Sequence, residues 1–228
     1  MHDLFKVLKS VAQWTPKKDS RFSESEVAAW ANQHALTCAG PTANAQFTVS
    51  GAINGHPWKI ERRAGSRQFI KGDELMARAV LDLPIDPVVI VMNKALKDVL
   101  EKQAYLIYTH QVRTLAEPSL TEEMRWLALY PEYLHPQLPK SFHQVCTVLA
   151  GSETDAARWM SHDLAELVWR SVAVDPELPF ILMLLRGKVY LQRQLKVSAE
   201  PGDVTALPES VKIFRTASES ALAGFSHW

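Results

Sequence analysis

The chain has 228 residues, of which 47% are hydrophobic, and its 25 lysines and arginines balance 25 aspartates and glutamates. This length and apolar content support a buried core and exclude a disordered polymer. Because the formal net charge is zero, the general attraction of a basic protein to nucleic acid or anionic lipid is absent, so any binding of a polyanion must be local.

Three features of the sequence indicate the cellular compartment. The longest apolar runs, VVIVM and FILMLL, are far shorter than the roughly 20 residues that cross a bilayer. The N-terminus lacks a signal-peptide pattern, because Asp3, Lys6 and Lys9 interrupt its apolar residues. The two cysteines, Cys38 and Cys146, are far apart and in no metal-ligand spacing, as expected for free thiols in a reducing compartment. We therefore expect a cytoplasmic protein without a membrane span.

Residues 1–21 are expected to form an amphipathic helix and a linker. Leu4, Leu8 and Val11 fall on one helical stripe of residues 3–13. Such a helix can anchor to a membrane surface, but the stripe is short, so docking on its own protein or on a second copy is favoured. Self-association is expected, with these three residues at the interface, and light scattering of the concentrated protein tests it.

The first half of the remaining chain predicts a helix and then strands. A helix is expected from a serine cap near residue 23 to about residue 34. Asn54-Gly55 between two alternating runs predicts a hairpin in which Trp58 and Ile60 face the core. Further strands at 74–83 and 88–92 would make four strands in succession, mostly antiparallel.

Residues after 94 return to a helical period. The helix that starts at Lys94 is apolar over much of its circumference and is expected to lie between layers. Ser119 and Glu122 have capping-box spacing, which predicts a second helix stopped by Pro131. The proline-rich residues 131–140 predict a stiff surface connection.

The last third of the chain is expected to contain both strands and helices. A strand is expected at 142–149 and a helix from Ser152, with Ser161 as an alternative second cap that splits it. Residues 180–195 predict a hairpin that turns at Arg186-Gly187 and has an apolar, central first strand. A helix over 209–225 closes the chain.

Together these elements predict an α+β fold with a mostly antiparallel sheet of about six or seven strands and helices packed on it. Residues 22–228 are expected to form one domain of two similar halves, 22–115 and 116–228, because a helix, a strand, a glycine turn and a strand occur in each. Limited proteolysis within 131–140 tests this, since two stable fragments would mean two domains.

Four cations follow the first hairpin: Arg62, Arg63, Arg67 and Lys71, with glycines and a serine between them. Arginine forks and exposed backbone N–H groups can hold phosphate or carboxylate groups. Glu61, Asp73 and Glu74 lie in the same segment and can instead neutralise the arginines on a solvated surface. Arg62→Ala and Arg67→Ala are expected to leave stability nearly unchanged and to affect only the binding of a ligand or partner.

The other chemistry-bearing residues form no consistent catalytic set. On the expected strand, His143 and Cys146 would point to opposite faces, and His162 and Asp163 diverge on the expected helix. No metal-ligand spacing and no phosphate-binding glycine loop occurs, so no metal and no cofactor are expected. Catalysis is left open, and we lean towards a protein that is not an enzyme.

Tryptophans also suggest contact surfaces. Most of the seven are explained by core filling, but Trp169 lies off the inner stripe of its helix and Trp228 is terminal. Both are predicted interface residues.

The run GAINGHPWKIERRAGSRQFIKGDELMARA joins an NG-x-P-W hairpin, a basic loop and a G-x-E-L-x-A-R-A strand. Over residues 50–80 it resembles a group of uncharacterised bacterial proteins, which implies a bacterial origin and brings no function with it.

The sequence therefore predicts a non-enzymatic bacterial interaction or accessory protein with a protein partner and no evident nucleic acid ligand. The alternative is a small-anion or phosphate-ligand binding protein or enzyme that uses Arg62, Arg63, Arg67 and Lys71. A concave pocket into which at least two of these cations converge would favour the alternative.

Overall fold

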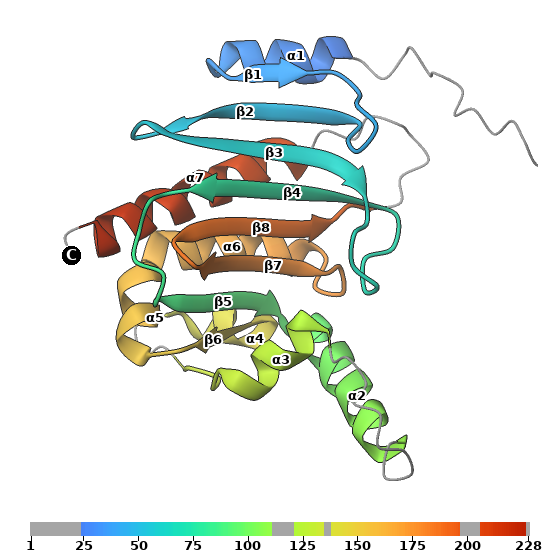
Figure 1. The fold of residues 1–228 in the computed structure, drawn as a ribbon, viewed down its shortest axis with the longest axis vertical. Coiled ribbons are helices and arrows are strands. Elements are labelled where there is room, and N and C mark those ends of the chain that lie inside the picture. The colour runs from blue at the N-terminus through green and yellow to red at the C-terminus, as the bar shows by residue number, and fades with distance from the viewer. Residues whose placement is uncertain (1–23, 111–120, 135–137, 197–205, 227–228) are drawn as a thin grey trace, which may run out of the picture.

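The computed structural model describes residues 24–110, 121–134, 138–196 and 206–226, which form one eight-stranded sheet with helices on both faces (Figure 1). The strands are β1 (Thr37–Ala39), β2 (Phe47–Ile53), β3 (His56–Ala64), β4 (Asp73–Val80), β5 (Val88–Asn93), β6 (Cys146–Ala150), β7 (Phe180–Leu185) and β8 (Lys188–Gln194). The helices are α1 (Glu24–Gln33), α2 (Lys94–His110), α3 (Glu122–Leu129), α4 (Lys140–Val145), α5 (Glu153–Trp159), α6 (His162–Val174) and α7 (Ala206–Phe225). The α+β class is confirmed, and the sheet has more strands than expected.

The strand order is β1-β2-β3-β4-β8-β7-β5-β6, and each neighbouring pair is antiparallel. Strands β2 to β5 follow one another along the chain as expected, but β5 does not pair with β4, because the β7–β8 hairpin lies between them. Residues 81–87 cross over the turn of that hairpin, where the Leu81 N–H donates to the Gly187 carbonyl at 3.2 Å. A Cβ on Gly187 would lie 2.4 Å from the Leu83 carbonyl oxygen, so this crossing requires glycine.

Both hairpins turn as the sequence predicts. Asn54 and Gly55 have φ values of 49° and 84°, and Arg186 and Gly187 have 53° and 69°. Two positive φ angles in a two-residue loop define the type I′ turn, which matches the twist of the flanking strands.

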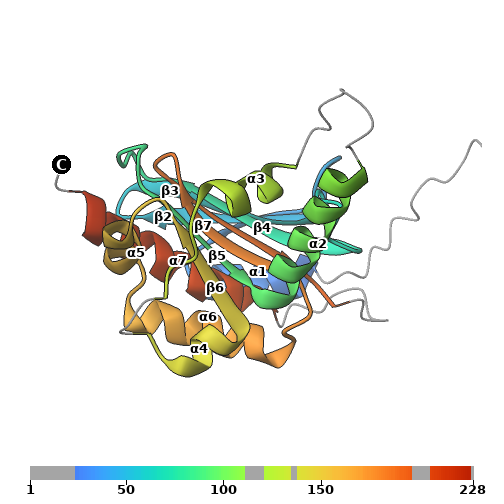
Figure 2. The same cartoon turned by 90° about the horizontal axis from the view of Figure 1, so that it is seen from below.

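One face of the sheet carries the larger core. It is covered by α1 and by α4 to α7, which Figure 2 shows gathered on one side. Trp58 and Ile60 belong to this core, and the Trp58 ring lies 5.9 Å from the Phe214 ring of α7. The prediction that both face the core is confirmed.

The other face is only partly covered. Leu96 and Leu100 of α2 and Trp126 of α3 pack on β5, β6 and β7 in a second core. The C-terminal part of α2 points away from the sheet (Figure 1), and Tyr105 and Leu106 are 68% and 54% exposed. The expectation that this helix lies between layers is therefore wrong.

Two local boundaries differ from the sequence predictions, and a third follows one of two stated alternatives. Residues 140–145 are helical and only 146–150 form a strand, so the strand expected at 142–149 is wrong in its first half. Helix α3 is capped by Thr121, whose hydroxyl accepts from the Met124 N–H, whereas Ser119 lies outside the described residues. Ser152 and Ser161 cap separate helices, which confirms the split alternative.

Candidate functional site

Arg62 lies on the side of the sheet that faces α7 and is 9% exposed. Its Nε and Nη2 donate to Asp73 Oδ2 at 3.1 and 3.0 Å. It lines a cavity of about 480 Å³ in which Arg193 and Lys196 are ion-paired with Glu209 and Asp175. The expected neutrality of Arg62→Ala does not fit this geometry, because the substitution would remove a buried, doubly bonded side chain.

Arg63 points to the opposite face and belongs to a buried network. Its Nε donates to Glu74 Oε1 at 2.8 Å, and Glu74 is fully buried. The same oxygen accepts from the Ser66 N–H at 3.2 Å, and Glu74 Oε2 accepts from Gln192 Nε2 at 2.6 Å. This network fastens the loop after β3 to β4 and β8.

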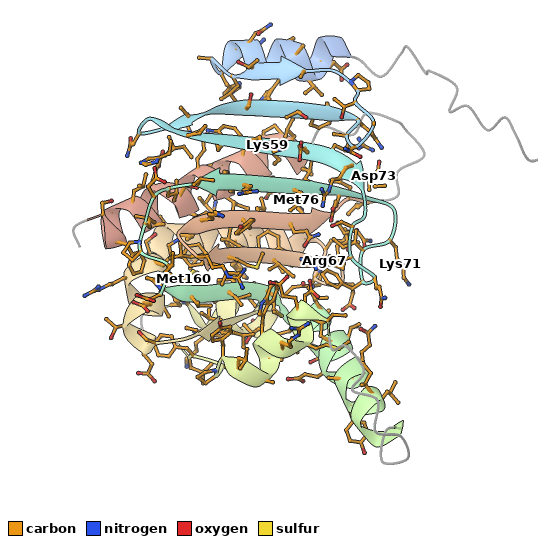
Figure 3. All side chains as sticks on the ribbon, viewed as in Figure 1. Lys59, Arg67, Lys71, Asp73, Met76 and Met160 are labelled. Atoms are coloured by element: carbon orange, nitrogen blue, oxygen red, sulfur yellow. The ribbon has the colours of Figure 1, made fainter. Side chains whose placement is uncertain are left out.

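Arg67 and Lys71 lie on the loop between β3 and β4 (Figure 3). Arg67 Nη1 is 3.1 Å from Glu123 Oε1, and its Nη2 is 3.5 Å from Glu122 Oε2, so this arginine joins the loop to α3. The Lys71 side chain is exposed, and its backbone N–H donates to Gln194 Oε1 at 2.7 Å. The three arginines thus face carboxylates on two sides of the sheet, and anion binding by the four cations stays a prediction.

Of the predicted interface residues, the structure describes Trp169 alone. It is half-buried against the larger core. Leu4, Leu8, Val11 and Trp228 lie outside the described residues. The interface role of all five, and self-association, stay predictions.

His143 and Cys146 do not have the geometry expected from the sequence. His143 is on α4, and Cys146 is the residue that ends it, so the strand geometry expected for this pair is wrong. In the described part of the chain, no group of three or more His, Cys, Asp or Glu residues has metal-binding geometry, and no helix is long and apolar enough to cross a membrane.

The two thiols are predicted to differ in reactivity. Burial raises the pKa of the Cys146 thiol to about 12, whereas Cys38 is half-buried near the edge of the sheet. Because the thiolate is the reactive form, Ellman's reagent at pH 8 should titrate Cys38 in the native protein and Cys146 only after denaturation. Cys38→Ser should abolish the native signal. Rapid native reaction of Cys146 would contradict its burial.

The uncovered part of the sheet is the main surface feature. No helix in the described ranges lies over the face of β2, β3, β4 and β8 that is turned away from α7 (Figures 1 and 2). Because cross-strand partners share a face, Ser50, Lys59, Arg78 and Tyr190 form one row across these strands. Thr48, Glu61, Met76 and Gln192 form the adjacent row, and Figure 3 marks Lys59 and Met76 on neighbouring strands. We name this surface the open sheet face.

A groove of mixed apolar and charged lining lies on the same side of the molecule as the open sheet face. Its volume is about 670 Å³, and it lies between α3, the start of β5 and the β7–β8 turn. Six of its lining residues are apolar or aromatic, namely Ile85, Val88, Trp126, Leu129, Tyr130 and Leu185, and four are charged, namely Asp86, Glu122, Arg125 and Arg186. Ile85 and Leu129 are 70% and 67% exposed, which is unusual for large aliphatic side chains that flank one depression.

Sequence reasoning missed both surfaces. Lys59 and Arg78 are far apart in the chain and become neighbours only through the β3–β4 register. The alternation of Arg78 and Val80 with the buried Ala77 and Ala79 was the available signal, since it marks a strand with a solvated outer face.

No protein-family model and no curated protein matches the sequence. This agrees with the resemblance to a group of uncharacterised proteins. Among solved structures, the crystal structure of the mycobacterial trehalose monomycolate transport factor A, TtfA, is similar with a TM-score of 0.45 and 11% identity, over 85% of this chain and 90% of that chain. This degree of similarity does not establish a shared function.

Proposed function

We propose that the chain is a non-enzymatic accessory protein that binds another protein on the side of the sheet that carries α2 and α3. The observation that supports this most is the groove with exposed Ile85 and Leu129, which lies on the same side of the molecule as the open sheet face. Large apolar side chains gathered around one depression are typical of protein contact sites.

A second feature supports a macromolecular partner rather than a small ligand. Tyr105 and Leu106 are exposed on the part of α2 that projects from the sheet. They add a second exposed apolar area on the side that carries α2 and α3, separate from the groove, as expected when the ligand is a folded chain or a long segment.

Photo-crosslinking tests the proposal. A benzoylphenylalanine at position 129 should give an ultraviolet-dependent adduct with one protein in a lysate of the source cells, identified by mass spectrometry. The matched control places the crosslinker at position 170 on α6, where Arg170 is exposed on the opposite side of the sheet. No adduct at position 129, or the same adducts at both positions, would contradict the proposal.

A further inference from the structure

We infer that the open sheet face binds an acidic polypeptide segment of the partner through Lys59, Arg78 and Lys188. This inference rests on the proposed function, because it names the chemistry of the same partner. It follows from the placement of cations across three strands.

The three cations form one cluster. Lys59 on β3 is directly opposite Arg78 on β4. Arg78 is opposite Tyr190 on β8, and Lys188 lies two residues before Tyr190 on the same face. Diagonal neighbours in a sheet are roughly 7–8 Å apart, so Lys188 is close enough to Arg78 to share a ligand with it.

This arrangement is unfavourable in the free protein. Like charges directly opposite each other destabilise a strand pair. Lys59 is partly compensated by Glu61, whose Oε1 is 2.8 Å from its Nζ. Within the described residues Arg78 and Lys188 have no carboxylate partner, and the Arg78 guanidinium instead lies 6.0 Å from the centre of the Tyr190 ring. The Tyr190 ring contacts the Arg78 guanidinium from one side, and the N–H groups of the guanidinium stay available for an incoming carboxylate.

The surroundings favour a polypeptide over a polyphosphate or a lipid surface. Val80 is 36% exposed beside the cluster, and Met76 and Tyr190 are half-buried on the same face. The carboxylate of Glu61 lies in the neighbouring row and would repel a continuous line of phosphates. A chain in which acidic and apolar side chains alternate matches both the charges and the apolar residues, and its apolar end can continue into the groove at Leu129.

Fluorescence anisotropy with a labelled peptide of alternating glutamate and valine tests the inference. The wild-type chain should bind it, and binding should weaken as salt increases. Arg78→Glu should weaken binding by about tenfold or more, because it replaces the central cation with a repelling charge. Arg78→Gln should have a smaller effect in the same direction. Lys212→Glu on α7 makes the same change of net charge on the opposite side of the molecule and should leave binding unchanged.

Several results would overturn the inference. They are no binding of the peptide, equal binding by Arg78→Glu, or equal weakening by Lys212→Glu. Tighter binding of polyphosphate or of phosphatidylglycerol vesicles would assign the face to another ligand. A dimer lost on Arg78→Glu would assign it to a second copy of the chain. If any of these occurs while crosslinking at position 129 captures a partner, the inference fails and the proposed function stands. If crosslinking at position 129 also captures no partner, the inference and the proposed function are both refuted.

Discussion

Replacing Trp58 with alanine is expected to lower the free energy of unfolding by about 3–5 kcal/mol, the usual cost of emptying a large aromatic site. The side chain is 3% exposed and packs on Phe214 of α7, so it joins the sheet to the helix that covers it. Its cross-strand partner on β2 is Gly51, where a Cβ would lie 3.2 Å from two carbons of the indole. The ring thus occupies space that the glycine leaves.

Urea denaturation measures this effect, and Lys59→Ala is the matched control, because it changes the next residue on the exposed face. Gly51→Ala should also destabilise, since its Cβ would be 2.7 Å from Leu36 Cδ2 and would press on the indole. Part of that cost should disappear in the Trp58→Ala background. A near-neutral Trp58→Ala would mean that the ring does not fill the core.

The turns and most helices could be predicted from the sequence because their causes are local. Asn54-Gly55 and Arg186-Gly187 meet the backbone requirement of a two-residue hairpin regardless of what surrounds them. Ser152 and Ser161 cap helices through hydroxyl groups that accept from backbone N–H groups three residues later.

The order of strands could not be predicted in the same way. Residues 88–92 form the expected strand, but an apolar run of this length does not indicate which strands it pairs with. Strand β5 pairs with β6 and β7, which are formed by residues far along the chain. A similar ambiguity explains residues 142–149, where Phe142 is fully buried in a helix and only the apolar residues from Cys146 onward belong to a strand, since periodicity does not separate these two states in so short a run.

The environment of each arginine depends on which carboxylate lies beside it in the sheet, and the order of residues in the sequence does not indicate this. Arg62 and Arg63 are adjacent in a basic run, yet they point to opposite faces of β3 and contact different carboxylates of β4. The sequence groups these cations because they are close along the chain. In a strand, consecutive residues point to opposite faces, and Lys59 is instead a cross-strand neighbour of Arg78.

The Glu74 network provides the second large expected effect. Glu74→Ala should lower the free energy of unfolding by about 3–5 kcal/mol, because removing one partner of a buried ion pair leaves the others without compensation. The substitution would take the acceptor from Arg63, from the Ser66 N–H and from Gln192, and would open a cavity between β3, β4 and β8. Glu74→Gln keeps the shape and one acceptor and should cost less. The matched control is Glu61→Ala, which breaks the ion pair with the exposed Lys59 and should cost less than about 1 kcal/mol. If urea denaturation gave the same small change for Glu74→Ala as for Glu61→Ala, the network would contribute no more than a surface ion pair, and the loop after β3 would have to be held in place by other contacts.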